Sequence, residues 1–206
     1  MPNVRGRRVV IVGDSLSAAA GAPGGELAAE LRAAGATVLV NARVGRSAHS
    51  FYAAEASQLD DIVQFQPELA IVWLGTNDCG QRPSVIAQRM AQLRDDLGEL
   101  GAEVWAFGPA QLPARLAGCR PAVVSTMATV FGPRFIDTAA LEGTKMVGRT
   151  ADGVHFTRAG ARALGERMAS AFLDADVGGR LLVELGLALG LVLGALALRG
   201  GGAVGV

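Results

Sequence analysis

The sequence predicts a three-layer α/β/α fold with a mostly parallel, five-stranded sheet, and three observations lead to this prediction. First, apolar runs rich in β-branched residues alternate along the chain with stretches whose apolar residues have helical spacing. Second, these runs are continuous, which is typical of strands that are buried on both faces. Third, the helical stretches are long enough to serve as the crossover connections that parallel neighbours need.

The first strand is predicted over 9–12, where four β-branched residues precede a glycine. Residues 24–34 are rich in Ala, Leu, Glu and Arg at helical spacing, and Gly35 is expected to end this helix. A second β-branched run over 37–40 leads into residues 41–50, whose Gly and Ser content is typical of a loop.

The middle of the chain continues the alternation. Residues 51–64 predict a helix, with Leu59, Ile62 and Val63 expected to face inward. Residues 69–74 then form another continuous apolar strand, which ends before the sequence Gly-Thr-Asn-Asp.

The last elements follow the same pattern. A proline at a first helical position, Pro83, opens a long helix that extends to about residue 100. A strand over 103–107, a helix over 121–130 and a short strand over 134–137 come next. Thr157 is expected to cap a final amphipathic helix that ends near residue 173.

Three polar or flexible positions follow the first three strands. The loops there carry Ser15, Gly45 and Asn77. Because the loops after parallel strands leave the same edge of the sheet, these residues can share one crevice. A serine in such a place is not by itself a nucleophile, since glycine-rich turns also cradle phosphates or simply reverse the chain. Catalysis needs a base and an oxyanion site as well.

Asp152 and His155 are the candidate source of the base. They lie three residues apart just before the final helix, so one turn of chain can aim the carboxylate at the imidazole. An imidazole has an ordinary pKa near ~6.5, which suits it to take up and return a proton near neutrality. The only other histidine, His49, has no adjacent carboxylate, and we interpret it as a polar loop residue.

Asn77 supplies a side-chain amide that could hold a tetrahedral oxyanion, and the backbone N–H groups of Ser15 and Gly45 supply two further donors. Taken singly, Gly45 is explained as a turn glycine and Asn77 as a turn or N-cap residue. Taken together with an Asp-His pair at the last loop, the set favours nucleophilic catalysis.

Four short motifs resemble, in order, the sequence blocks of the GDSL/SGNH hydrolase family: Gly13-Asp14-Ser15-Leu16, Gly45, Gly75-Thr76-Asn77-Asp78 and Asp152-Gly153-Val154-His155. The resemblance implies a flavodoxin-like three-layer fold in which Ser15 is the nucleophile, His155 the general base and acid, and Asp152 its orienting partner. It also implies that Gly45 and Asn77 complete an oxyanion hole with the Ser15 amide. No metal and no cofactor is implied.

The resemblance extends over residues 8–173, with a departure after the histidine, where the family often has proline and this chain has Phe156. The loop over 45–51 resembles the matching loop of carbohydrate acetylesterases in the same superfamily, which favours O-acetyl groups on sugars. We therefore expect a serine ester hydrolase that acts on short acyl esters of carbohydrates or small lipids.

Two alternatives stay open. An acyltransferase with the same catalytic residues differs only in whether water or another hydroxyl group meets the acyl-enzyme. A non-catalytic carbohydrate- or lipid-binding module is disfavoured because no catalytic position has been lost. A phosphate-binding role is weaker still, since no Walker-type lysine follows the first glycine loop.

Composition excludes several other classes. Lys and Arg total 19, Asp and Glu also total 19, and the basic residues are scattered, so no nucleic-acid partner is expected. The two cysteines, Cys79 and Cys119, are too few for a disulfide scaffold or a Cys-rich metal site; they form either one bridge or two reduced thiols. No apolar leader follows the basic N-terminus, which predicts a cytoplasmic location unless a leader has been removed.

The C-terminal part differs in composition from the rest. We expect the α/β domain over 1–174, a linker over 175–180 and an apolar tail over 181–206. Within the tail, residues 181–198 carry only one charge, Glu184, and as a helix they would span about 27 Å. Leucine also alternates there with small residues, as in a strand, but eighteen residues is long for one. We expect a helix that attaches to a membrane or pairs with another chain.

Overall fold

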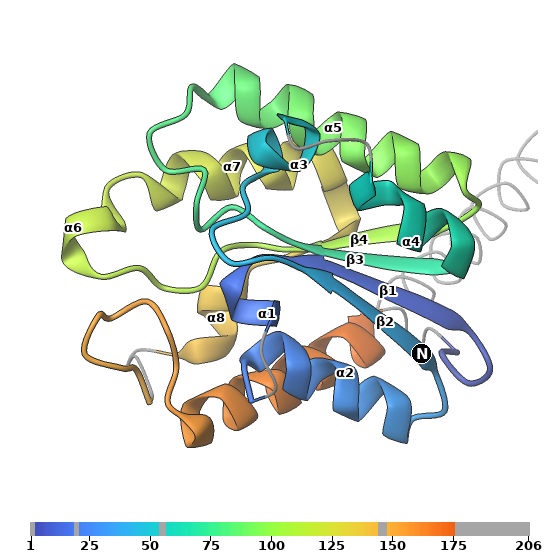
Figure 1. Cartoon of the computed structure of the whole chain (residues 1–206). Coiled ribbons are helices and arrows are strands. Elements are labelled where there is room, and N and C mark those ends of the chain that lie inside the picture. Colours follow the sequence, from blue (N-terminus) through green and yellow to red (C-terminus); the bar gives the residue numbers. More distant parts are fainter. Residues whose placement is uncertain (1–2, 19–20, 54–56, 144–147, 176–206) are drawn as a thin grey trace, which may run out of the picture. The chain divides into compact units, whose positions relative to one another are not determined.

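The computed structural model describes residues 3–18, 21–53, 57–143 and 148–175 (Figure 1). The chain divides into two units, one over Asn3–Ala171 and one that combines Met1–Pro2 with Phe172–Val206. The first unit carries every candidate site residue. The expected tail and the linker from residue 176 onward lie outside the described residues.

A five-stranded parallel sheet in the order β2-β1-β3-β4-β5 forms the centre of the first unit, as the sequence predicted. The chain runs from β1 outward to β2 and then returns to the other side of β1 to form β3. In open α/β sheets, ligands bind at the carboxyl ends of the strands beside such a reversal. The strands are β1 (Arg8–Gly13), β2 (Thr37–Ala42), β3 (Leu69–Trp73), β4 (Glu103–Phe107) and β5 (Phe135–Ile136).

Helices cover both faces of this sheet (Figure 1). One face carries α3, α4, α5 and α7, and the other carries α1, α2 and the final helix. The side chains of β3 and, after Arg8, those of β1 are therefore buried, which explains the continuous apolar runs in the sequence. The helices are α1 (Ser15–Ala18), α2 (Pro23–Ala33), α3 (Ala48–Ala53), α4 (Ser57–Phe65), α5 (Pro83–Glu99), α6 (Ala114–Ala117), α7 (Arg120–Phe131), α8 (Thr138–Glu142) and the final helix over 158–175.

The expectation of a helix over 51–64 was wrong at its start. Helix α3 begins at Ala48, because the backbone N–H of Ser50 donates to the Ser47 hydroxyl at 3.0 Å and the N–H of Ser47 donates to the Ser50 hydroxyl at 2.8 Å. Helix α4 covers Ser57–Phe65, and residues 54–56, on which the continuity of the expected helix depends, lie outside the described residues. Its buried face carries Ile62, whereas Val63, expected inside, is 48% exposed.

The short elements near the end of the sheet were also misjudged. Helices α6 and α8 fall where the sequence predicted no helix, and β5 has two residues instead of four. The start of α8 is explained locally, since the Asp137 carboxylate accepts a hydrogen bond from the N–H of Ala139 at 3.1 Å. Thr157 caps the final helix as expected, accepting from the N–H of Gly160 at 3.3 Å.

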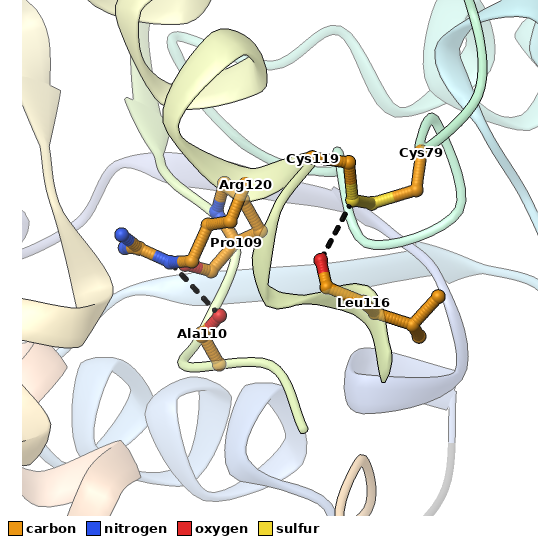
Figure 2. Close-up of a disulfide and its surroundings, with 6 residues drawn as sticks. All are labelled: Cys79, Pro109, Ala110, Leu116, Cys119 and Arg120. Atoms are coloured by element: carbon orange, nitrogen blue, oxygen red, sulfur yellow. Dashed lines mark hydrogen bonds between the residues drawn. A yellow bond between two sulfur atoms is a disulfide. The ribbon is translucent and has the colours of Figure 1, made fainter. Parts of the chain in front are cut away.

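A disulfide joins Cys79, in the loop after β3, to Cys119 at the start of α7 (Figure 2). The sequence left this pairing open. The next residue, Arg120, donates from Nε to the carbonyl oxygens of Pro109 and Ala110, each at 3.1 Å. The start of α7 thus holds the loop after β3 and the loop after β4 together.

Candidate active site

Ser15 lies just past the carboxyl end of β1, as the first residue of α1. Gly13, the last residue of β1, pairs with Ala42 of β2 and Trp73 of β3, so the ends of three strands lie at one level. A Cβ atom at Gly13 would lie 2.3 Å from the hydroxyl oxygen of Ser17. The sharp turn that presents Ser15 therefore requires glycine at this position.

The structure brings Ser15, His155 and Asp152 into one hydrogen-bonded chain. The Nε2 atom of His155 lies 3.1 Å from the Ser15 hydroxyl oxygen, and its Nδ1 atom lies 2.6 Å from the Oδ2 atom of Asp152. With Nδ1 protonated and donating to the carboxylate, Nε2 carries the lone pair that can accept the serine proton. The side chains of His155 and Asp152 are 47% and 44% exposed, so the arrangement is open to solvent.

Hydrogen bonds hold the carboxylate of Asp152 in its charged form. Its Oδ1 atom accepts from the backbone N–H groups of Val154 and His155, at 2.8 and 3.0 Å, and from the Thr150 hydroxyl at 2.8 Å. The bonds from His155, followed by those from Thr150 and Val154, keep the pKa of Asp152 well below its ordinary range. Gly153 permits the turn, since its φ is +71°.

Asn77 lies in the loop after β3, and its side-chain amide is held by two acceptors. Its Nδ2 atom donates to the carbonyl oxygen of Arg46 at 3.0 Å and to Oδ2 of Asp14 at 3.3 Å. Arg46 directly follows Gly45, whose φ of +73° suits glycine. The structure thus brings the loop that carries Gly45 against Asn77, next to the turn that carries Ser15.

Sequence reasoning missed the role of Arg46, whose guanidinium is buried behind this loop. Its Nη1 atom donates to the backbone and side-chain oxygens of Asn41, at 2.7 and 2.8 Å, and to the carbonyl oxygen of Gly13 at 3.3 Å. Burial lowers the pKa of Arg46 to about 10, so it stays charged at neutral pH. Arg46 therefore joins the ends of β1 and β2 below the candidate site.

Sequence reasoning also missed two buried aspartates, Asp78 and Asp14, which hold the backbone around the candidate site. Asp78 is 1% exposed and accepts from the N–H of Ala48 at 3.0 Å, which ties the loop after β3 to the start of α3. Asp14 is equally buried and accepts from the N–H of Leu16 at 2.8 Å. Burial raises the pKa of Asp78, and burial likewise raises the pKa of Asp14 to about 6. A charged residue beside an apolar strand end was the available signal for both.

His49 lies in the first turn of α3 with an exposed side chain, and not in a loop as we interpreted it. Among the described residues there is no group of three or more His, Cys, Asp or Glu side chains that could hold a metal ion. In the same part of the chain, no helix combines the length and apolar character needed to cross a membrane.

A half-buried serine at a strand end, joined by hydrogen bonds through histidine to a carboxylate, has the geometry of a serine-hydrolase site on a doubly wound sheet. The model of the GDSL-like lipase/acylhydrolase family matches residues 11–163. The chain therefore belongs to this family of ester hydrolases. No curated protein matches the chain significantly.

Solved structures share the fold at low sequence identity. TesA is 21% identical with a TM-score of 0.66, and the match covers 82% of this chain and 99% of TesA. The acetylxylan esterase Axe2 from Geobacillus stearothermophilus is 16% identical with a TM-score of 0.66, covering 85% and 96% of the two chains. The acetyl xylan esterase AlAXEase is 18% identical with a TM-score of 0.64, covering 80% and 98%.

Proposed function

We propose that this protein hydrolyses carboxylic esters through an acyl-enzyme on Ser15. The observation that carries the proposal is the hydrogen-bonded chain from Asp152 through His155 to the Ser15 hydroxyl. Family membership supports the reaction class.

In the acylation step, Oγ of Ser15 attacks the ester carbonyl carbon while Nε2 of His155 takes the hydroxyl proton. The charged Asp152 stabilises the imidazolium that forms and keeps Nδ1–H directed toward itself. The imidazolium then protonates the departing alcohol oxygen as the ester bond breaks. In deacylation, the oxygen of a water attacks the acyl carbon while His155 takes a proton from it; the bond to Oγ of Ser15 then breaks as the imidazolium returns that proton to Oγ, which releases the free acid.

The negative charge on the carbonyl oxygen of the tetrahedral intermediate needs donors. The backbone N–H groups of Ser15 and Gly45 and the amide of Asn77 are the groups we propose for it. The bond from Asn77 to the carbonyl oxygen of Arg46 fixes the orientation of the amide, and its second N–H, held here by the longer 3.3 Å bond to Asp14, is the one we propose to pass to the oxyanion.

Short acyl esters of carbohydrates, above all acetyl esters, are the proposed substrate class. The resemblance of the loop over 45–51 to that of carbohydrate acetylesterases supports it, and two of the similar structures are acetyl xylan esterases by name. The half-exposed side chains of Asp152 and His155 fit a bulky alcohol group that approaches from solvent.

The test combines active-site labelling with a substrate panel. A fluorophosphonate should label Ser15 in the wild type and leave Ser15→Ala unlabelled, with the rate of ester hydrolysis reduced by about 10³-fold or more. A panel of p-nitrophenyl esters should show turnover falling from acetyl to longer chains. Full hydrolysis by a folded Ser15→Ala protein would overturn the proposal. Product analysis with an added sugar acceptor separates hydrolysis from acyl transfer.

A further inference from the structure

Arg149 lies at the base of the loop that carries Asp152 and His155. It forms an antiparallel bridge with Phe156, and the N–H of Thr150 donates to the carbonyl oxygen of His155 at 2.9 Å. The loop is therefore closed at residues 149 and 156, with the two site residues between them. Whatever holds Arg149 also holds the backbone on both sides of the imidazole.

The guanidinium of Arg149 reaches three separate segments. Its Nη1 atom donates to the carbonyl oxygen of Val154 at 2.5 Å, which is the peptide group joined to His155. Its Nη2 atom donates to the carboxylate of Glu142 at 2.6 Å and to the carbonyl oxygen of Gln111 at 3.0 Å. Among side chains, only the planar guanidinium of arginine has enough N–H groups to donate to these three acceptors at once.

The ion pair between Arg149 and Glu142 is buried, with side-chain exposures of 7% and 3%. The second oxygen of Glu142 accepts from the N–H of Gln111 at 2.6 Å. The carboxylate thus joins α8 to the loop after β4. Arg149 attaches the loop over 149–156, which we call the site loop, to both of these segments. Both carboxylate oxygens of Glu142 and both terminal nitrogens of Arg149 are hydrogen-bonded in this buried pair, so its geometry is more restricted than that of the exposed bonds at Asp152.

Phe156 completes the restraint. The Arg149 guanidinium carbon lies 3.6 Å from the centre of the Phe156 ring, which is close stacking. A proline at this position would restrict its own φ and the backbone of the preceding residue, His155. This chain has no proline there, so the backbone at His155 needs another restraint. The bond to Val154 and the stack on Phe156 supply it from both sides.

We propose that Arg149, held by Glu142 and stacked on Phe156, is a positioning residue that sets the orientation of the His155 imidazole for proton transfer. The proposal rests on the proposed function. Arg149 does not touch the reacting atoms; it acts through the backbone of Val154 and the ring of Phe156. Its effect should therefore be largest for the step in which His155 protonates the leaving alcohol.

The test compares two acetate esters that differ in their need for that proton. The alkoxide of an alkyl acetate must be protonated as it leaves, whereas p-nitrophenolate leaves without a proton. We expect Arg149→Lys to lower kcat/KM by about 10²-fold for the alkyl ester and by about tenfold for p-nitrophenyl acetate, mainly through kcat. A loss of folded protein lowers both values equally, so the ratio of the two reports positioning alone.

Two further variants control the result. Phe156→Leu keeps the ion pair and an apolar side chain but removes the stack, and it should shift the ratio in the same direction by a smaller factor. Arg120→Lys weakens another ion pair, with Asp137, outside the site loop, and it should leave the ratio unchanged. This control separates general destabilisation from a change at the imidazole.

Equal losses for both esters in Arg149→Lys and Phe156→Leu would overturn the role of Arg149. So would an effect confined to KM. These results are distinct from a failure of the proposed function, which would appear as absent fluorophosphonate labelling of Ser15 in the wild type.

Discussion

The Nε2 atom of His155 lies 3.1 Å from the hydroxyl oxygen of Ser15, although 140 positions separate the two residues in the chain. Ser15 is carried by the turn after β1, and His155 by the loop just before the final helix. That helix packs on α2 at Gly165, where an added Cβ atom would lie 2.5 Å from Cβ of Glu26 and 2.9 Å from the backbone nitrogen of Leu27. Close packing of two helices therefore helps to set the distance between the proposed nucleophile and the proposed base.

Gly165→Ala should move the final helix away from α2. Overpacking of this kind costs about 1–3 kcal/mol of unfolding free energy, and kcat should fall by about tenfold or more as His155 shifts. Urea unfolding and ester hydrolysis measure the two effects. The matched control is Gly98→Ala in α5, where an added Cβ meets no atom within 4 Å. It should stabilise by about 0.5–1 kcal/mol and leave kcat unchanged; similar behaviour of both variants would contradict the packing argument.

Asn77→Ala should lower kcat by about 10²–10³-fold with little change in KM, because an oxyanion donor acts only on the transition state. Steady-state kinetics on p-nitrophenyl acetate and a thermal unfolding curve are the measurements. A folded variant whose main defect is a raised KM would show that Asn77 binds substrate. A variant that fails to fold would show that the bonds of Asn77 to Arg46 and Asp14 are needed for the stability of the fold.

Asp14 predicts an unusual pH dependence of stability. Its pKa is raised by burial from 3.8 to about 6, so between these values the folded state holds a proton that the unfolded state has lost. The free energy of unfolding from this group therefore falls as pH rises through that window, by about 3 kcal/mol in all. In Asp14→Asn this contribution is absent. Urea unfolding should show that the free energy of unfolding of the variant, relative to that of the wild type, increases from pH 4 to pH 7. The same difference at both pH values would refute the assignment.

Reduction of the disulfide between Cys79 and Cys119 should destabilise the protein. The bridge closes a sequence separation of 40 residues, and a loop of that length corresponds to about 4 kcal/mol in the chain-entropy model. Dithiothreitol should lower the Tm by roughly 10 °C, and kcat should fall because Asn77 lies two residues before Cys79. The variant with serine at both positions should have the Tm of the reduced protein, and dithiothreitol should not change it. A wild-type Tm that is insensitive to dithiothreitol would contradict this.

The sequence by itself determined the strands, most helices and the order of the elements, because strand and helix periodicities are local properties of the chain. It also singled out Ser15, Asn77 and the Asp152–His155 pair as candidate site residues, since each follows or precedes such an element directly. These residues were found as members of short motifs, without knowledge of their separations in space.

Only the tertiary structure decided the rest, because it depends on contacts between residues that are distant in the chain. The start of α3 is held by Asp78, thirty positions away, in addition to the local Ser47–Ser50 bonds, and the disulfide depends on where α7 begins. The burial of Asp14 and the ion pair of Arg149 with Glu142 likewise arise when separate segments pack together. A charged side chain in a loop has the same local pattern whether it is solvated or buried, and only packing removes the water that distinguishes the two.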